Sequence, residues 1–268
     1  MIPFAKTEAH GNDFLVVAEE HATQTPSALA IAMCDRLRGI GADGLILYRG
    51  ENDRFVMTLF NSDGSSAEIS GNGLRCLAAY LTYSGLATGS EIEVETGAGL
   101  MKLRALERKG TTFRFRADMG PPRDIETGVK IDIDIDIDIG KRTITVTTLS
   151  MGNPHCVVFT ERDALRELGP ILESHPHFPD RTNVELVDVV DRHTIRMAIW
   201  ERGAGETASS GTGSSASAVA SIVNAHVESP VAVHCPGGTL EVEWTEGRSV
   251  FLTGDAVVVA EGNYWRQS

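Results

Sequence analysis

Two short stretches, ISGNG at residues 69–73 and SSGTG at residues 209–213, have the same order of features. Each has a serine, then a Gly-x-Gly turn, then apolar residues at the i, i+3, i+4, i+7 spacing of a helix with one buried face. Those apolar residues are Leu74, Leu77, Ala78 and Leu81 in the first case, and Ala216, Val219, Ala220 and Val223 in the second. The pattern therefore predicts two similar helices, the first of them capped at its end by Gly85.

The two stretches belong to a longer internal repeat. RFVMTLFNSDGSSAEISGNG at residues 54–73 aligns without a gap on TIRMAIWERGAGETASSGTG at residues 194–213. HGNDFLVV (residues 10–17) pairs with MGNPHCVV (151–158), and VETGAGLMKL (94–103) pairs with VHCPGGTLEV (233–242). Because the matches occur in the same order, the sequence predicts one structural unit written twice.

Strand-like runs surround both predicted helices, at residues 14–17, 45–48, 55–60, 91–95, 143–147, 156–159, 194–200 and 250–252. They favour an α+β fold with two pseudo-symmetric lobes from the internal repeat, each a β-sheet wrapped around a central helix. MGPP at residues 119–122 marks the boundary, because a proline pair breaks the strands of the first lobe. We expect an N-terminal lobe at 1–118, completed by the tail at about 253–268, and a C-terminal lobe at 119–252.

The run IDIDIDIDI at residues 131–139 alternates strictly. A period of two predicts a strand with isoleucines on one face and aspartates in water. The alternative, a metal-binding acidic tract, is less favoured because that period spreads the carboxylates along a solvated face.

Composition limits the partners. The formal net charge is −13 and the basic residues are scattered, which argues against nucleic acid as a partner. Charges at Lys6, Glu8 and Asp13 interrupt any signal peptide, and the longest uncharged stretch, 207–227, is too rich in serine to span a membrane. The four cysteines are far apart, without metal-ligand spacing. We therefore expect a cytoplasmic protein with no membrane contact and no metal.

The N-terminus of a helix attracts anions, since its unpaired N–H groups carry a partial positive charge. If the two lobes face one another, Gly71-Asn72-Gly73 and Gly211-Thr212-Gly213 converge on one carboxylate. The alternative is that each serine is only a helix N-cap. Polar residues at the ends of the neighbouring apolar runs favour a site: Asn12, Asn61, Asp63, Asn153, Asn183, Glu201, Arg202 and Glu206.

The chain resembles the diaminopimelate epimerases, cofactor-independent amino-acid epimerases, over essentially its full length. The motifs that carry the resemblance are HGNDF (10–14), GIGADG (39–44), NSDGSSAEISGNGLRC (61–76), MGNPHCV (151–157), RTNVEL (181–186), ERGAGETASSGTG (201–213) and PGGTLEVEW (236–244). The resemblance implies a two-base epimerase that interconverts LL- and meso-diaminopimelate, as a homodimer with a small-molecule amino-acid substrate and no cofactor.

The resemblance also implies a role for each site residue. The distal amino and carboxylate groups of the substrate would be held by Asn12, Asn61, Asn153, Asn183 and Arg202. The α-carboxylate would lie against the backbone N–H groups of Gly71, Asn72, Gly211 and Thr212, with His155 and Glu201 beside the α-amino group. The two acid/base positions fall on Ser70 and Ser210, where the family has cysteines.

The two serines are the main departure from the family. A serine hydroxyl is several pKa units weaker as an acid than a thiol, and each unit costs about 1.4 kcal/mol, or tenfold in the reactive population. Serine can still act if a second group takes its proton, and His155, Glu68, Glu201 and Glu206 are the candidates.

Other functions stay open. A diaminopimelate-like binding protein would keep the pocket without turnover, and a divergent isomerase would use Glu68 or Glu206 as a single base. The glycine turns lack the full G-x-G-x-x-G context of a dinucleotide site, and SSGTG lacks the G-x-S-x-G elbow of a hydrolase.

Overall fold

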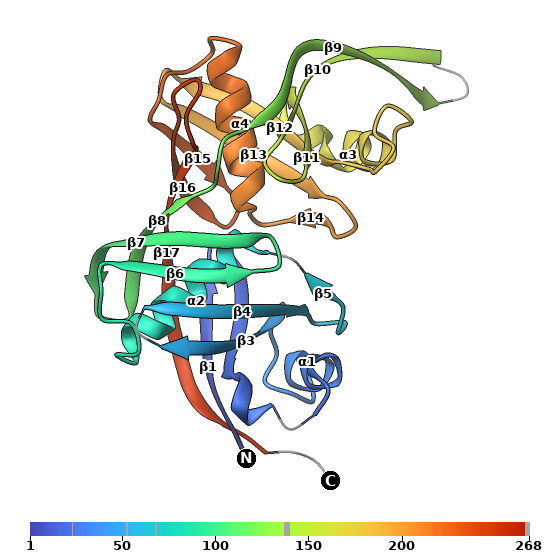
Figure 1. The fold of residues 1–268 in the computed structure, drawn as a ribbon. Helices are drawn as coiled ribbons and strands as arrows, with labels where there is room; N and C mark the ends of the chain where they lie inside the picture. The colour runs from blue at the N-terminus through green and yellow to red at the C-terminus, as the bar shows by residue number, and fades with distance from the viewer. Residues whose placement is uncertain (23, 52, 68, 137–139, 266–268) are drawn as a thin grey trace. The chain divides into compact units, whose positions relative to one another are not determined.

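The computed structural model describes residues 1–268 except 23, 52, 68, 137–139 and 266–268 (Figure 1). The chain has a mixed α+β fold with few helices and divides into two compact units. The first consists of Met1–Asp118 and Thr253–Ser268, and the second of Met119–Leu252.

In the first unit, hydrogen-bonded strands form a closed ring. The strands are β1 (Ile2–Ala9), β2 (Asn12–Ala18), β3 (Gly44–Glu51), β4 (Arg54–Asn61), β6 (Glu91–Thr96), β7 (Gly99–Lys109), β8 (Thr112–Asp118) and β17 (Phe251–Tyr264). Each pairs with the next in that order, and β17 closes the ring on β1. The pairs β2–β3 and β4–β6 are parallel, whereas β1–β2, β3–β4, β6–β7, β7–β8 and β17–β1 are antiparallel. Helix α1 (Pro26–Cys34), the short 3-10 helix η1 (Glu19–His21) and β5 (Ser66–Ala67) complete the unit.

Helix α2 (Gly71–Tyr83) packs against β1, β2 and β8 of this ring. The four predicted core positions, Leu74, Leu77, Ala78 and Leu81, are all buried. The expectation of a single buried face was nevertheless too narrow, because strands enclose the helix and bury further residues, including Arg75. The helix ends at Tyr83 with Ser84 as C-cap; Gly85 follows it in the left-handed conformation, with φ +75°.

The second unit is built around helix α4 (Gly211–Val223). Its strands are β9 (Arg123–Asp136), β10 (Gly140–Ser150), β11 (Pro154–Phe159), β12 (Asn183–Asp191), β13 (Thr194–Glu201), β14 (Gly205–Thr207), β15 (Val231–Cys235) and β16 (Gly238–Glu243). Pairs β11–β12 and β13–β15 are parallel, while β10–β11, β12–β13 and β15–β16 are antiparallel, so the directions follow those from β1 to β7. Helix α3 (Leu165–Glu173) and the 3-10 helix η2 (Arg162–Ala164) lie between β11 and β12 in the chain.

Helix α4 is almost entirely buried. Ala216, Val219 and Ala220 lie in the core as predicted, whereas Val223 is only half-buried near the end of the helix. Strands on several sides also bury the serines of the helix, which the one-face pattern did not anticipate.

The alternating run lies in β9. Ile131 and Ile133 are buried, Asp132 is exposed, and the hydroxyl of Thr143 on β10 donates to Asp132 Oδ1 at 2.6 Å. The strand prediction is confirmed up to Asp136, and residues 137–139 lie outside the described part. Among the described residues, no group of three His, Cys, Asp or Glu side chains is arranged to hold a metal.

One edge of each unit collects the polar residues. Strand β2 begins at Asn12, the parallel strand β3 begins at Gly44, and the antiparallel strand β4 ends at Asn61. In the second unit Asn153 precedes β11, Asn183 begins β12 and Glu201 ends β13. The alternation of strand directions thus gathers residues that are distant in sequence. No helix in the described part of the chain has the length and apolar character needed to cross a membrane.

Candidate active site

Ser70 and Ser210 are the N-caps of α2 and α4. Ser70 Oγ accepts a hydrogen bond from the N–H of Gly73 at 3.1 Å, and Ser210 Oγ accepts one from the N–H of Gly213 at 3.2 Å. The capping role is therefore real in both motifs. It also holds each hydroxyl in the partial positive charge of a helix N-terminus, which favours its ionised form.

A chain of side-chain amides starts from the first turn of α2. Asn72 Nδ2 donates to Asn12 Oδ1 at 2.6 Å, and Asn12 Nδ2 donates to Asp43 Oδ2 at 3.2 Å. Asn12 and Asn72, both assigned to substrate binding by the family resemblance, are therefore in direct contact. Asp43, which lies between α1 and β3, accepts the last hydrogen bond of this series of side chains.

Arg75 binds Asn72, the first residue of this series of hydrogen-bonded side chains. Its Nη2 donates to Asn72 Oδ1 at 2.5 Å, while Nε and Nη1 have no hydrogen-bond partner among the described residues. The side chain is fully buried, and burial lowers the pKa of the guanidinium to about 10. Burying a cation with so few hydrogen-bond partners costs stability.

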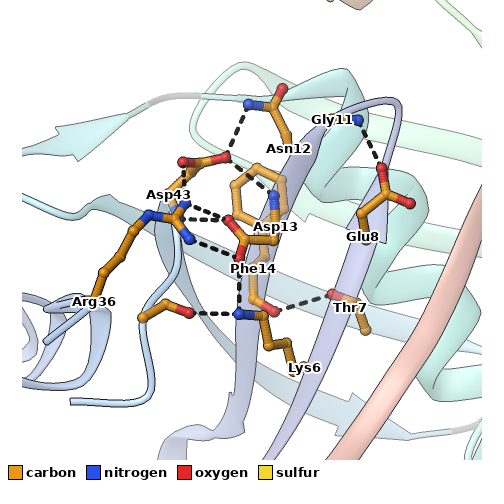
Figure 2. A network of polar contacts seen from close by, with 10 residues as sticks. Lys6, Thr7, Glu8, Gly11, Asn12, Asp13, Phe14, Arg36 and Asp43 are labelled. Atoms are coloured by element: carbon orange, nitrogen blue, oxygen red, sulfur yellow. Dashed lines mark hydrogen bonds and ion pairs between the residues drawn. The ribbon is translucent and has the colours of Figure 1, made fainter. Parts of the chain in front are cut away.

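Ion pairs fix the start of β2, as Figure 2 shows. Asp13 accepts from Arg36 Nη2 at 2.8 Å and lies 2.9 Å from Lys6 Nζ, and Arg36 Nη2 also reaches Asp43 Oδ1 at 2.8 Å. Burial alone would raise the pKa of Asp13, but the hydrogen bonds from Arg36 and Lys6 lower it to about 2. Asp13 is thus ionised at neutral pH and serves to hold the loop beside Asn12.

Asn61 lies at the exposed end of β4. It pairs in register with Gly44, and its Nδ2 donates to Ser65 Oγ at 2.9 Å. The N–H of the next residue, Ser62, donates to the carbonyl of Asp43 at 3.0 Å. Asn61 therefore belongs to the same edge as Asn12 and Asp43.

In the second unit, Ser210 lies beside an acid. Its side chain lies near the carboxylate of Glu201 and helps to lower the pKa of that group, and the carboxylate accepts a hydrogen bond from Thr207 Oγ1 at 2.5 Å. Burial raises the pKa of Glu201, and the side chains of Thr207 and Ser210 oppose that rise. A carboxylate with a raised pKa next to a hydroxyl is a suitable proton acceptor.

His155 is buried and held at both ring nitrogens. Nδ1 lies 2.7 Å from Glu185 Oε1, and Nε2 lies 3.0 Å from Asn153 Oδ1. Asn153 Nδ2 donates to Thr212 Oγ1 at 3.4 Å, which connects the ring to the first turn of α4. The sequence predicted His155, Asn153 and Thr212 as site residues, and the structure brings the three together.

Asn183 and Arg202 are also neighbours. Asn183 Nδ2 donates to the carbonyl of Pro154 at 2.9 Å, and its Oδ1 accepts the N–H of Arg202 at 3.0 Å. The guanidinium of Arg202 is exposed and donates to the carbonyl of Asp180 at 3.2 Å. Asn183 thus fixes the backbone that presents Arg202.

The structure separates the candidate proton acceptors. Glu201 contacts Ser210, whereas Glu206 is exposed and accepts from Arg166 Nε at 2.8 Å. Glu68 lies outside the described residues. Sequence reasoning missed Arg75 and Glu185, although a charged residue inside an otherwise apolar helix or strand was the available signal.

None of the cysteines offers a substitute thiolate. All four are free; Cys34, Cys76 and Cys156 are buried, and Cys235 is half-buried. Burial raises the pKa of Cys34 and of Cys76 to about 12, and also raises the pKa values of Cys156 and Cys235. Acid–base chemistry at these helix ends therefore depends on the serines and their neighbours.

A family model described as diaminopimelate epimerase matches residues 4–125 and 147–259, which include both helix ends and every described site residue. The chain belongs to the diaminopimelate epimerase family. The resemblance inferred from the sequence motifs is thereby confirmed.

Similar proteins agree with this membership. The diaminopimelate epimerase of Pelotomaculum thermopropionicum is 40% identical over 97% of this chain and 98% of its own length. That of Moorella thermoacetica is 42% identical with the same coverage of both chains.

Solved structures of low sequence identity share the fold. A structure described as a predicted epimerase from Pseudomonas aeruginosa has a TM-score of 0.75 at 17% identity and covers 100% of both chains. A hydroxyproline epimerase from Agrobacterium vitis, with bound trans-4-OH-L-proline, has a TM-score of 0.70 at 16% identity, covering 97% of this chain and 91% of its own.

Proposed function

We propose that this member of the diaminopimelate epimerase family interconverts LL- and meso-diaminopimelate by proton transfer at the α-carbon, with serines in the two acid/base positions. Curated relatives at about 40% identity over nearly the full chain support the reaction. The isomerase class and the amino-acid substrate follow from that membership, and the roles of individual residues are our proposal.

The proximity of the Ser210 side chain to the buried carboxylate of Glu201 is the observation that carries the proposal for the serines. As Ser210 Oγ takes the α-proton, its own hydroxyl proton passes to the Glu201 carboxylate. The serine then never has to exist as a free alkoxide, so the large pKa gap between serine and cysteine matters less. In this proposal the Glu201 carboxylate accepts the proton that a cysteine thiolate would accept at the same position in the family.

Ser70 has the complementary role of proton donor in this direction. Its hydroxyl gives a proton to the opposite face of the carbon, and the N–H of Gly73 stabilises the oxygen left behind. In the reverse direction the ionised Ser70 oxygen takes the α-proton, while Ser210 gives its hydroxyl proton to the other face and recovers one from Glu201.

The polar residues bind the substrate. Asn12, Asn61, Asn153, Asn183 and Arg202 would hold the distal amino and carboxylate groups. Glu201, together with His155 through its contact with Asn153, would position the α-amino group. The helix ends at Gly71, Asn72, Gly211 and Thr212 supply backbone N–H groups for the α-carboxylate. The contacts of Asn12 with Asn72, and of Asn153 with Thr212, support these assignments, because they join a distal-end residue to each helix end.

We also propose that the two units are pseudo-symmetric lobes, with boundaries at 1–118 plus 253–268 and 119–252. The matching order of strand pairings supports a common origin. A homodimer and a cytoplasmic location remain predictions. Sedimentation equilibrium of the purified chain tests the first, and cell fractionation tests the second.

The test is solvent-deuterium exchange on LL- and meso-diaminopimelate. We expect deuterium at the α-position and conversion of one isomer to the other. If calorimetry detects binding while no deuterium enters, the chain is a binding protein and the epimerase proposal is wrong. A gain of exchange on restoring cysteine at both Ser70 and Ser210 would then identify the serines as the cause.

A further inference from the structure

Glu185 is a buried carboxylate in the middle of an apolar strand. Its neighbours along β12 are Val184 and Leu186, and its side chain is fully buried. Oε2 has no hydrogen-bond partner among the described residues. A carboxylate in this position is costly unless paired, and burial raises the pKa of Glu185 against the opposing effect of His155. The fold alone gives no reason to retain it.

The other carboxylate oxygen points at the candidate site. Oε1 lies 2.7 Å from His155 Nδ1 and would lie 3.0 Å from a Cβ at residue 213, in the first turn of α4. A glycine at that position allows the helix backbone to approach the carboxylate. The close approach connects Glu185 to the helix end that carries Ser210.

From His155 a line of contacts leads to the capping serine. The ring Nε2 meets Asn153 Oδ1 at 3.0 Å and the Asn153 amide meets Thr212 Oγ1 at 3.4 Å. Thr212 Oγ1 is in turn 3.4 Å from Ser210 Oγ. Since a carbonyl oxygen only accepts, Nε2 must carry a hydrogen for the first contact to form.

We propose that Glu185 is a positioning residue for the epimerase site: its carboxyl group shares a proton with His155 Nδ1 and so fixes the ring with a hydrogen on Nε2, which orients Asn153 and Thr212 beside Ser210. This inference rests on the proposed function for its effect on turnover. Fixing a ring tautomer through its second nitrogen is a general use of a buried acid.

The experiment compares Glu185→Gln with Glu185→Leu, using Val187→Ala as the matched control. Val187 is a buried residue two positions along the same strand that only packs in the apolar core. The Gln amide can still donate to Nδ1 and preserve the Nε2–H ring, whereas Leu cannot. Circular dichroism checks the fold of each variant.

The first measurement is the ¹⁵N spectrum of the His155 ring in labelled protein without substrate, assigned by the signal lost in His155→Gln. We expect an Nε2–H ring in the wild type and in Glu185→Gln, and a mixture of tautomers in Glu185→Leu. An unchanged ring in Glu185→Leu would overturn the proposal. If Glu185→Leu does not fold, an Nδ1–H ring in Glu185→Gln would overturn it instead.

The second measurement is kcat/KM for meso-diaminopimelate. We expect a loss of about tenfold in Glu185→Leu, the effect of one lost oriented hydrogen bond, and a recovery to near wild type in Glu185→Gln. An equal loss in Val187→Ala would reduce Glu185 to a packing role. If the wild type binds diaminopimelate without turning it over, the proposed function fails by itself, and the ring spectra still decide the positioning role.

Discussion

The N-termini of α2 and α4 share a serine cap and a Gly-x-Gly turn, but their surroundings differ. A Cβ at Gly73 would lie 3.5 Å from the side chains of both Phe14 and Ile46, so the first turn of α2 rests on apolar groups. The corresponding positions in the repeat alignment and strand register of the second unit are His155 and Glu185. The same backbone motif therefore has an apolar support in one unit and a titratable pair in the other.

The contrast continues at the strand ends and inside the helices. In the internal alignment Glu201 corresponds to the neutral Asn61, and the buried cation Arg75 corresponds to Ser215, whose hydroxyl donates to the carbonyl of Gly211 at 2.9 Å. At the aligned positions that the structure describes, the second unit has Glu201, Glu185 and His155 where the first has Asn61, Ile46 and Phe14. The repeat supplies two serine-capped helix N-termini, and under the proposed function the neighbouring residues decide which of them can store a proton.

Of the substitutions that test this difference between the two helix ends, Glu201→Gln should have the largest effect on turnover. Loss of a general base typically reduces turnover about 10²- to 10⁴-fold, and we expect a loss in that range. The measurement is the rate of deuterium entry into LL-diaminopimelate. Glu206→Gln is the control, because Glu206 is exposed and paired with Arg166. Equal losses in both variants would refute the assignment of the proton store to Glu201.

Substituting cysteine at Ser70 and at Ser210 separately tests whether the two serines differ in their need for a nearby base. A thiol ionises several pKa units more readily than a hydroxyl, so restoring it should raise turnover by about tenfold or more at a serine without a nearby base. We expect Ser70→Cys to gain more than Ser210→Cys, since Ser210 already has Glu201 beside it. Steady-state epimerisation rates of the two single variants check the order. The reverse order would contradict the difference proposed between the two helix ends.

The stability of the two units should depend differently on pH in the acid range. The ion pairs of Asp13 have no counterpart at the aligned Pro154, and the folded-state pKa of Asp13 is lowered from 3.8 to about 2. Their contribution is therefore present above pH 4 and is lost as the pH falls from about 4 to 2. Asp13→Asn should cost about 1 kcal/mol at neutral pH, because the partners are partly exposed.

Urea unfolding at pH 7 and pH 2.5 measures that contribution. We expect the difference between wild type and Asp13→Asn to shrink at the lower pH. Hydrogen exchange should place the loss of protection around residues 36–43. A constant difference across this pH range would mean that the ion pairs add no stability.

The smallest expected effect on stability is that of Arg75→Met. Removing the buried cation relieves its desolvation but leaves Asn72 Oδ1 without that donor, so the free energy of unfolding should change by less than about 1 kcal/mol. KM for diaminopimelate should rise nonetheless, because Asn72 and Asn12 lose their anchor. Thermal unfolding and steady-state kinetics test the two parts. A large fall in stability with unchanged KM would make Arg75 structural.

The sequence alone determined the family and part of the secondary structure; helices α1 and α3 and strands β1, β7, β8, β12, β15 and β16 were not predicted. Period 3.6 after each Gly-x-Gly turn predicted α2 and α4, period two predicted β9, and the predicted strand runs lie in observed strands, except that β17 begins one residue after Val250. These successes share a physical reason, because local burial patterns and caps are written in neighbouring residues. The site residues were assigned by resemblance, and their catalytic roles remain to be tested.

Only the tertiary structure decided which acid meets Ser210. Glu201 and Glu206 were both candidate proton acceptors in the sequence, but the β13–β14 register places Glu206 opposite Trp200, next to Arg166 of α3. Glu201 lies on the opposite face of this strand pair from Glu206, together with Ile199 and Thr207. On that face it lies near Ser210 at the N-terminus of α4. Side chains on a strand change face at every residue, so the pairing register alone determines which carboxylate lies beside the hydroxyl.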